Sequence, residues 1–346
     1  MITQKELARI LGVSQVTVSA ILRNGALAEH YRPELRRKVL ETAAKLGYCR
    51  NEIACAVRNR KSNVIGFMTQ EFSNGYAGLI LEGIMDAASK HSYLVKTFSV
   101  FREEEPSQDT FEREAEYIAS HCIGQRLAGL ISFDVIFPEI LNKLSAQLKQ
   151  AEIPLVLAGT RPKCEPDCIE LYSDMEQAGK LIFNYLYGLG HRKIALTGPY
   201  DWAPNNRCLI ESINKAAAEY VDPKKNIIDL TDLTPDSFCF ETVRKKLQRF
   251  APTAIFCLTD FNALEMITSL GRLGIKVPED ISVLGYGNLR FSRNCQPQIT
   301  SVDNNLYNIG YRAAEILLET ITHPGTPIKT EYCAHTLVKR SSCSKI

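Results

Sequence analysis

The sequence predicts an all-α head followed by a larger α/β body that contains two doubly wound parallel sheets. Three observations support this fold class. Apolar residues recur at helical spacing between Thr3 and Asn24, the first 62 residues carry an excess of positive charge, and apolar strands alternate with amphipathic helices from Asn63 onward. With 346 residues, of which 45% are hydrophobic, the chain is long enough to form two or three domains.

The first 24 residues predict two short helices joined by a tight turn. Thr3 can cap the first helix, Gly12 can end it, and Ser14 can cap the second. Apolar residues form the inward faces: Leu7, Ala8, Ile10 and Leu11 in the first helix, and Val18, Ile21 and Leu22 in the second. The outer faces of the second helix carry small or polar residues: Gln15, Val16, Thr17, Ser19 and Ala20. This pattern is typical of a DNA-binding helix-turn-helix, although an ordinary helical hairpin shares it.

The context favours DNA binding over the ordinary hairpin. A third amphipathic helix is expected from Pro33 to Leu46. The first 62 residues contain 12 Lys and Arg against 5 Asp and Glu, a net charge of +7. The remaining 284 residues contain 29 Lys and Arg against 34 Asp and Glu, a net charge of −5. A basic head on a near-neutral chain is what binding to DNA phosphates requires.

Residues 51–62 (NEIACAVRNRKS) connect the head to the body and are compatible with a short helix. Isolated helices shorter than about 12 residues are marginal in water. We therefore expect this segment to fold only when two copies meet on DNA, and a plain linker is the alternative.

Two sets of alternating strands and helices predict the body, because such alternation is typical of parallel sheets with crossover helices. The first set has strands at 64–68, 93–100, 127–133 and 154–159, with helices at 78–91, 109–122 and 138–151. The second set has strands at 169–173, 193–198, 226–230, 254–258 and 281–287, with helices at 175–189, 205–220, 236–250 and 261–273.

Composition excludes several classes of protein. No apolar run approaches the roughly 20 residues that span a bilayer, and the charged first helix lacks the apolar core of a signal peptide, so a cytoplasmic protein without a membrane partner is expected. The 11 cysteines are scattered and odd in number, which predicts reduced thiols. Cys164 and Cys168, with Cys49 and Cys55, could form a metal or redox site, but the sequence has no compact CxxC pair, which favours unremarkable free cysteines. We predict no metal and no cofactor.

The body could also belong to an α/β enzyme, but the motifs of the common enzyme classes are missing. The sequence has no Walker A motif, no GxGxxG after a strand, no GxSxG elbow and no HExxH. Asp174 and Asp260 follow strands and could form a carboxylate pair, but their spacing in sequence says nothing about their distance. We therefore predict a ligand sensor with no catalytic residue.

Several motifs in one order carry a resemblance to a known family. GVSQVTVSAILRN (12–24), KLGYCRN (45–51) and AVRNRKSNVIGF (56–67) resemble the head of the LacI/GalR (lac-repressor-like) transcription regulators. Further matches are LGHRKIAL (189–196), PTAIFCLTDFNAL (252–264), GIKVPEDISVLGYGN (274–288) and ITSVDNN (299–305). The resemblance implies a homodimeric repressor that binds a palindromic operator in double-stranded DNA. It also implies a periplasmic-binding-protein-like body that binds a small-molecule effector.

The resemblance implies a domain plan. Residues 1–50 form the helix-turn-helix head, 51–62 a hinge helix, and 63–346 the effector-binding and dimerisation body. Within the body, subdomain one comprises about 63–162 and 291–323, and subdomain two about 163–290 and 324–340. The helix at 307–322 should return to the first half, and His191 should be structural. The tail KRSSCSKI has no heptad run, so a coiled-coil tetramer is not expected.

The expected DNA-binding residues lie in the head and the hinge helix. Val57 stands where family members place a leucine that wedges into the minor groove, so a shallower wedge is expected. Ala20 replaces a usual arginine, the loop from Arg23 to Arg32 is about three residues longer than usual, and Arg32 replaces a small polar cap. The predicted DNA-binding set is Thr3, Ser14, Gln15, Val16, Thr17, Ser19, Ala20, Asn24, Asn51, Ala54, Val57 and Arg58.

The expected effector site lies beyond the carboxyl ends of the strands, where ligands of open α/β sheets bind. The predicted effector-binding set is Phe72, Ser73, Tyr76, Phe133, Arg161, Trp202, Arg207, Thr259, Asp260, Asn288 and Asn304. Core packing is the alternative for the aromatic residues. Ala158, Thr259 and Gly287 replace three sugar-binding side chains of family members, whereas Arg161 and Arg207 can pair with an anion. We therefore expect a carbohydrate-related or anionic effector, such as a sugar acid, a sugar phosphate or a purine-like compound.

Overall fold

The computed structural model describes residues 2–22, 26–49, 62–70, 72, 75–100, 107–135, 137–159, 168–198, 204–230, 240–325 and 330–346. The chain divides into two compact units, residues 1–60 and residues 61–346. The first unit contains the head, and the second contains the body.

The head is a bundle of short helices: α1 (Gln4–Leu11), α2 (Gln15–Leu22), α3 (Ala26–Glu29) and α4 (Pro33–Lys45). Its core contains the buried side chains of Leu7, Val18, Ile21 and Val39. Most of the expected inward residues pack there, but Ile10 is 55% exposed and its predicted inward position is wrong. The apolar stripe of an eight-residue helix is narrow, and Leu7 and Ala8 fill it.

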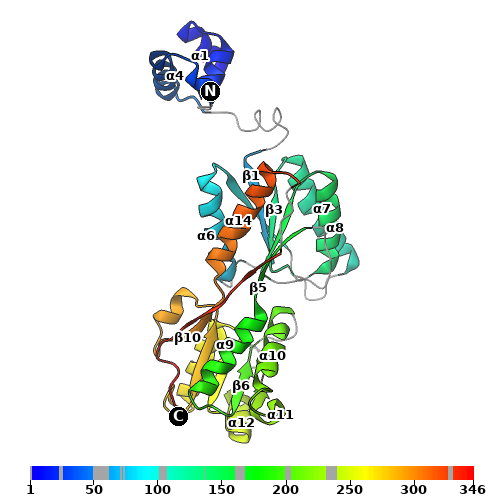
Figure 1. The fold of residues 1–346 in the computed structure, drawn as a ribbon, viewed down its shortest axis with the longest axis vertical. Helices are drawn as coiled ribbons and strands as arrows, with labels where there is room; N and C mark the ends of the chain where they lie inside the picture. The colour runs from blue at the N-terminus through cyan, green and yellow to red at the C-terminus, as the bar shows by residue number, and fades with distance from the viewer. Residues whose placement is uncertain are drawn as a thin grey trace. The chain divides into compact units, whose positions relative to one another are not determined.

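The first half of the body is a six-stranded sheet in the order β11-β5-β4-β3-β1-β2, with parallel neighbours throughout. Its strands are β1 (Val64–Thr69), β2 (Leu94–Ser99), β3 (Leu130–Phe133), β4 (Leu155–Gly159), β5 (Ile169–Ser173) and β11 (Glu331–Cys333). Helices α6 (Tyr76–Lys90) and α14 (Leu306–Thr322) share one core with the sheet, and α7 (Gln108–Gly124) and α8 (Pro138–Gln150) share the other. The sheet therefore has helices on both faces (Figure 1).

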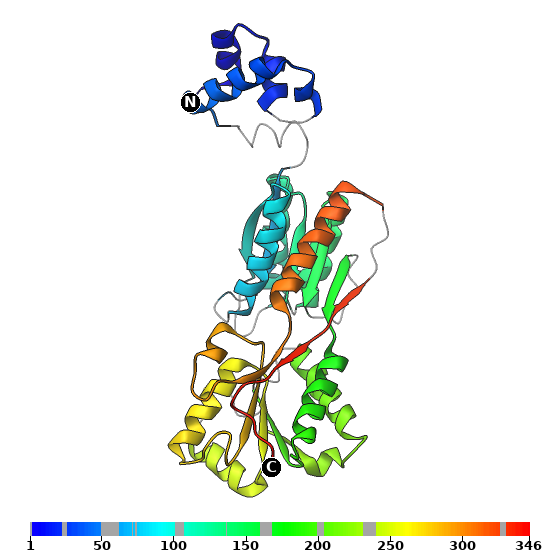
Figure 2. The same cartoon turned by 60° about the vertical axis from the view of Figure 1, so that its left-hand side comes forward.

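The second half repeats this plan with the order β12-β10-β9-β8-β6-β7, in which only β12 is antiparallel to its neighbour. Its strands are β6 (Ile194–Thr197), β7 (Ile227–Asp229), β8 (Ala254–Cys257), β9 (Ser282–Tyr286), β10 (Thr300–Asp303) and β12 (Thr336–Val338). Helices α9 (Met175–Gly188) and α10 (Pro204–Ala217) cover one face, and α12 (Phe240–Phe250) and α13 (Asp260–Arg272) cover the other (Figure 2). Short helices α11 (Pro223–Asn226) and η2 (Arg290–Arg293) complete this half. The predicted pair of doubly wound parallel sheets is confirmed.

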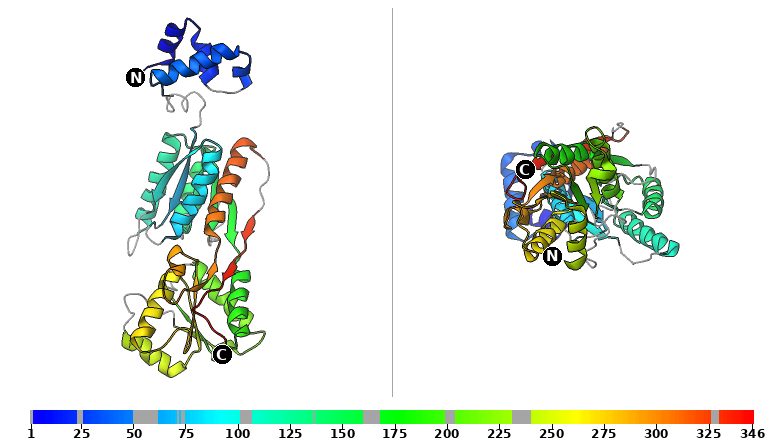
Figure 3. Two further views of the ribbon diagram at one scale, coloured as in Figure 1. Left: turned by 90° about the vertical axis from the view of Figure 1, so that its left-hand side faces the viewer. Right: turned by 90° about the horizontal axis from the view of Figure 1, so that it is seen from below.

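Three described segments join the halves: Ser173 to Asp174, Asp303 to Leu306, and Cys333 to Thr336. Helix α14 returns to the first half, as expected, and packs along α6 (Figure 3). The strand at 169–173 pairs with β4 rather than opening the second sheet, and the strand at 300–303 belongs to the second sheet rather than to the first half. The apolar pattern of a strand does not show which of the two sheets it joins. Only strand pairing therefore shows where the chain crosses from one half to the other.

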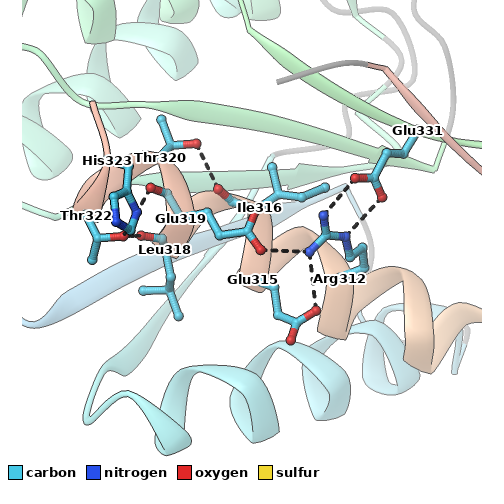
Figure 4. Close-up of polar contacts among 9 residues, drawn as sticks. All are labelled: Arg312, Glu315, Ile316, Leu318, Glu319, Thr320, Thr322, His323 and Glu331. Atoms are coloured by element: carbon cyan, nitrogen blue, oxygen red, sulfur yellow. Dashed lines mark hydrogen bonds and ion pairs between the residues drawn. The ribbon is translucent and has the colours of Figure 1, made fainter. Parts of the chain in front are cut away.

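Arg312 connects α14 to β11, the strand that directly precedes the third segment between the halves. Its guanidinium donates to both carboxylate oxygens of Glu331 at 3.0 and 2.7 Å, and to Glu319 on the same helix at 3.0 Å (Figure 4). This bidentate pair lowers the pKa of Glu331. It connects the last crossing strand to the helix that covers the first sheet.

Candidate functional site

Capping residues hold the two head helices in place. The Thr3 hydroxyl oxygen accepts from the Glu6 amide at 3.2 Å, and the Glu6 carboxylate accepts from the Thr3 amide at 2.7 Å. These bonds lower the pKa of Glu6. Gly12 ends α1 at φ 66°, and the Ser14 hydroxyl accepts from the Thr17 amide at 3.0 Å. The predicted caps are confirmed, and they set α2 at a defined angle to α1.

Helix α2 presents an outward face with few apolar groups. Gln15 and Val16 are exposed, Val16 by 74%, while Val18 and Ile21 are buried. Three further candidate DNA-binding residues of this helix are partly exposed: Thr17, Ser19 and Ala20. The predicted division of α2 into inner and outer faces is confirmed. An amide and a small apolar side chain therefore stand where a base edge could be contacted.

Several candidate residues lie outside the described part of the chain. For DNA these are Asn24, Asn51, Ala54, Val57 and Arg58, and for the effector they are Ser73, Arg161 and Trp202. Their assignments stay predictions. Within the longer connection between α2 and α4, the structure shows the short helix α3, and Arg32 caps α4 with no side-chain hydrogen bond.

Tyr76, the first residue of α6, links the two halves of the body. Its hydroxyl donates to the Tyr286 carbonyl at 3.0 Å. A Cβ atom on Gly287 would lie 2.5 Å from the Tyr76 ring, so the ring fills the space beside this glycine. A second link on the same helix is the ion pair of Glu82 with Arg290 at 2.8 Å. Burial raises the pKa of Tyr76 well above its ordinary value.

The other aromatic candidates of the first half differ in exposure. Phe72 is 38% exposed and meets the Phe67 ring edge-on at 6.0 Å. Phe133 is buried in the core of the first half, and its ring lies against Gly159. Core packing, which the sequence left open as the alternative, therefore describes Phe133.

Asp260, expected to orient an effector, is buried and bonded within the second half. Its carboxylate accepts from the Leu289 amide at 2.7 Å, the Ser292 hydroxyl at 2.6 Å and the Ser301 hydroxyl at 2.7 Å. Burial raises the pKa of Asp260 despite these donors. Its bonds fix the β9–η2 segment, which makes Asp260 a positioning residue.

Two neighbours of Asp260 are also engaged. Asn288 donates to the Asp303 carboxylate at 2.9 Å and accepts from Arg340. The Thr259 hydroxyl caps α13 by accepting from the Asn262 amide at 3.0 Å. The expectation that Asn288 and Asp260 reach an effector conflicts with these bonds, because a ligand would have to break them first.

The three crossover segments bring polar residues together. Asp174 caps α9, and the Gln177 side chain holds the His335 backbone through bonds of 2.9 and 3.0 Å. His335 Nε2 lies 2.8 Å from the Tyr286 hydroxyl. Burial lowers the pKa of His335 to about 4, so its ring is neutral at pH 7. Sequence reasoning missed His335, because its short apolar surroundings carry no motif.

The remaining candidates occupy structural or surface positions. Arg207 lies in the first turn of α10 and is exposed. His191 is buried, with Nδ1 3.1 Å from the Thr253 hydroxyl and Nε2 3.2 Å from the Ser344 carbonyl. This pairing of both ring nitrogens matches the structural role that the resemblance implied.

The described residues contain no group of three or more His, Cys, Asp or Glu side chains that could hold a metal ion. No helix among them is long and apolar enough to cross a membrane.

Comparison with known proteins places the chain beside transcription regulators. A family model described as a periplasmic binding protein-like domain matches residues 183–343. Catabolite control protein A of Priestia megaterium is 28% identical over 319 residues, covering 91% of each chain. The transcriptional repressor PurR of Vibrio vulnificus is 26% identical over 335 residues, covering 93% of this chain and 92% of its own.

Among solved structures, the lac repressor dimer bound to operator and the anti-inducer ONPF has the same fold. It superposes with a TM-score of 0.81 at 20% identity, and covers 99% of both chains.

Proposed function

Because this chain belongs to the LacI/GalR family of bacterial transcription regulators, we propose that it acts as a homodimeric repressor whose affinity for a palindromic operator depends on a small-molecule effector. It is a DNA-binding regulator rather than an enzyme, like the relatives that it matches along most of its length. We place it in the cytoplasm, where its DNA lies, and divide it into a head (1–50), a hinge helix (51–62) and a body (63–346).

The outward face of α2 carries this proposal. Gln15 can bond bidentately to adenine, while Val16 and Ala20 can contact a thymine methyl group. The hydroxyl oxygens of Thr3 and Ser14 accept the capping bonds. These residues would therefore contact DNA phosphates by donating their hydroxyl hydrogens. Asn24 and the hinge residues Asn51, Ala54, Val57 and Arg58 complete the proposed contact set. Half-sites rich in A and T are expected opposite α2.

Selection of bound sequences from random DNA tests this function. The expected result is an inverted repeat with A or T opposite Gln15 and Val16. A matched control is Gln15→Ala, which should relax the preference at one position of each half-site while leaving the repeat symmetry intact. A direct repeat, or enrichment without symmetry, would contradict a two-fold symmetric dimer on DNA.

For the effector we propose a molecule that carries an anionic or strongly accepting group. Arg207 and Arg161 are the candidate partners of that group, because guanidinium pairs bidentately with carboxylate or phosphate. Phe72, Tyr76 and Trp202 are the proposed flat surfaces, and Asn304 a polar contact. We assign Asp260, Asn288 and Thr259 the role of fixing the wall of the site, given the bonds they already make.

Thermal-shift screening separates the classes of effector. Acidic and phosphorylated sugars should raise the unfolding midpoint of the wild-type chain, and the rise should shrink in Arg207→Ala. A suitable control is Arg192→Ala, because Arg192 is outside the proposed contact set: its guanidinium lies over the Tyr187 ring and donates to the Tyr187 and His191 carbonyls. Stabilisation by a neutral sugar alone, unchanged in Arg207→Ala, would refute this effector class.

A further inference from the structure

Ser62, the last residue of the segment that joins head and body, is held by three hydrogen bonds. Its backbone amide and its hydroxyl each donate to the Arg126 carbonyl at 2.9 Å. The hydroxyl oxygen also accepts from the Val64 amide at 3.3 Å. Two of these three bonds belong to the side chain, so they depend on a hydroxyl at this position.

Asn63, the next residue, is held from the other side of β1. Its side-chain amide donates to the Ser92 carbonyl at 3.3 Å, and its own carbonyl accepts from the Leu94 amide at 2.8 Å. Strand β1 lies between β2 and β3 in the sheet, and Leu94 begins β2, whereas Arg126 precedes β3. We call Ser62 and Asn63 the anchor, because they bond to the connections on both sides of β1.

The two turns that receive the anchor are closed against the ends of α6 and α7. Ser92 and Arg126 both have left-handed backbones, with φ of 61° and 54°. Their amides donate back to the last turns of the helices, from Ser92 to the Ser89 carbonyl and from Arg126 to the Ile123 carbonyl, both at 3.0 Å. The anchor is therefore fixed to two helices that pack on opposite faces of the first sheet (Figure 1).

Operator recognition places a demand on this junction that non-specific DNA binding lacks. In the proposed dimer, the two copies of the hinge segment 51–62 order against each other on the operator, so the end of each copy has to lie at a defined point. Ordering a residue only on binding costs conformational entropy, whereas a residue already held in the free protein does not add that cost. Phosphate contacts of the head need no such meeting of the two segments.

We propose that Ser62 and Asn63 are positioning residues for operator recognition, an inference that rests on the proposed function of the hinge helix. The anchor holds the body end of the hinge segment in the free protein, and the two copies then meet without ordering the junction as well. The side chains of the anchor touch no DNA in this role. They act through the carbonyl groups of Arg126 and Ser92, which fix them to the body.

Binding of the full chain to its selected operator and to random DNA tests this role. Ser62→Ala removes both side-chain bonds and keeps the backbone bond to Arg126. We expect the ratio of operator affinity to random-DNA affinity to fall roughly fivefold or more, because about one residue per protomer is then ordered only on binding. Ser62→Thr keeps a hydroxyl and should restore the ratio. The matched control is Ser120→Ala, which removes a similar bond to a backbone carbonyl, that of Tyr117 within α7.

Thermal unfolding of the same variants separates positioning from stability. Ser120→Ala should keep the wild-type ratio even where its unfolding midpoint falls, and Asn63→Ala, which removes only the side-chain bond to Ser92, should lower the ratio as Ser62→Ala does. A wild-type ratio in both anchor variants, at any midpoint, or an equal fall in Ser120→Ala, would overturn the proposal. A wild-type chain that prefers no DNA sequence would refute the proposed function itself, and with it the role of the anchor.

Discussion

Replacing Gly83 by alanine should separate the two helices that cover one face of the first sheet. A Cβ atom at position 83 would lie 2.0 Å from the Tyr307 carbonyl oxygen and 2.8 Å from the Tyr311 amide nitrogen. Both are backbone atoms of α14 and cannot rotate away. Ordinary contact begins at 3.4 Å, so α6 has to retreat by roughly 1.4 Å, the difference between these two distances.

The retreat loosens a tightly packed apolar interface. Overpacking of this kind costs roughly 1–3 kcal/mol, and a clash with backbone belongs at the upper end. The gain in helix propensity from glycine to alanine offsets about 1 kcal/mol. The net loss of about 2 kcal/mol corresponds to a fall in Tm of roughly 4–8 °C for a domain of this size.

Gly78→Ala is a matched control because it makes the same substitution in the same helix. No atom lies within 4 Å of a Cβ at this position, so only the propensity gain of about 0.5–1 kcal/mol remains, and Tm should rise. Thermal unfolding of both variants, followed by circular dichroism, checks the contrast. Equal midpoints for the two variants would refute the close crossing of α6 and α14.

Three further predictions concern the hinge, the head and the pH dependence of stability. Val57→Gly should weaken operator binding but leave affinity for random DNA nearly unchanged, because the head keeps its phosphate contacts; equal loss on both DNAs would identify 51–62 as a plain linker. Thr3→Ala should lower the free energy of unfolding of the head by about 1 kcal/mol, because it removes the cap of α1. Denaturant unfolding of the full chain measures this loss, and an unchanged free energy would show that the cap contributes nothing. Because burial lowers the pKa of His335 from 6.5 to about 4, the unfolded chain binds the extra proton between these values, and stability should fall by up to ~3 kcal/mol as the pH drops through this window. His335→Gln should flatten that part of the profile, and an unchanged profile would argue against the buried neutral ring.

The sequence was sufficient for features that depend on neighbours along the chain. Helix caps at Thr3 and Ser14 and the helix end at Gly12 involve residues within a few positions, so local pattern predicts them. The alternation of apolar strands and helices likewise predicted both sheets. Helical periodicity also predicted the inner and outer faces of α2. The same reasoning failed at Ile10 of the short helix α1, which is exposed.

Tertiary structure alone decided features that depend on residues far apart in sequence. Which sheet receives the strand 169–173 is a matter of pairing with β4, and the strand's own residues fit either sheet. Asp260 looked available beyond its strand, yet donors that lie 29 to 41 residues away occupy its carboxylate. The partners of His335, Gln177 and Tyr286, are far from it in sequence and reach it only in the folded body. Hydrogen bonds and burial depend on distance in space, and one sequence without its fold contains no measure of that distance.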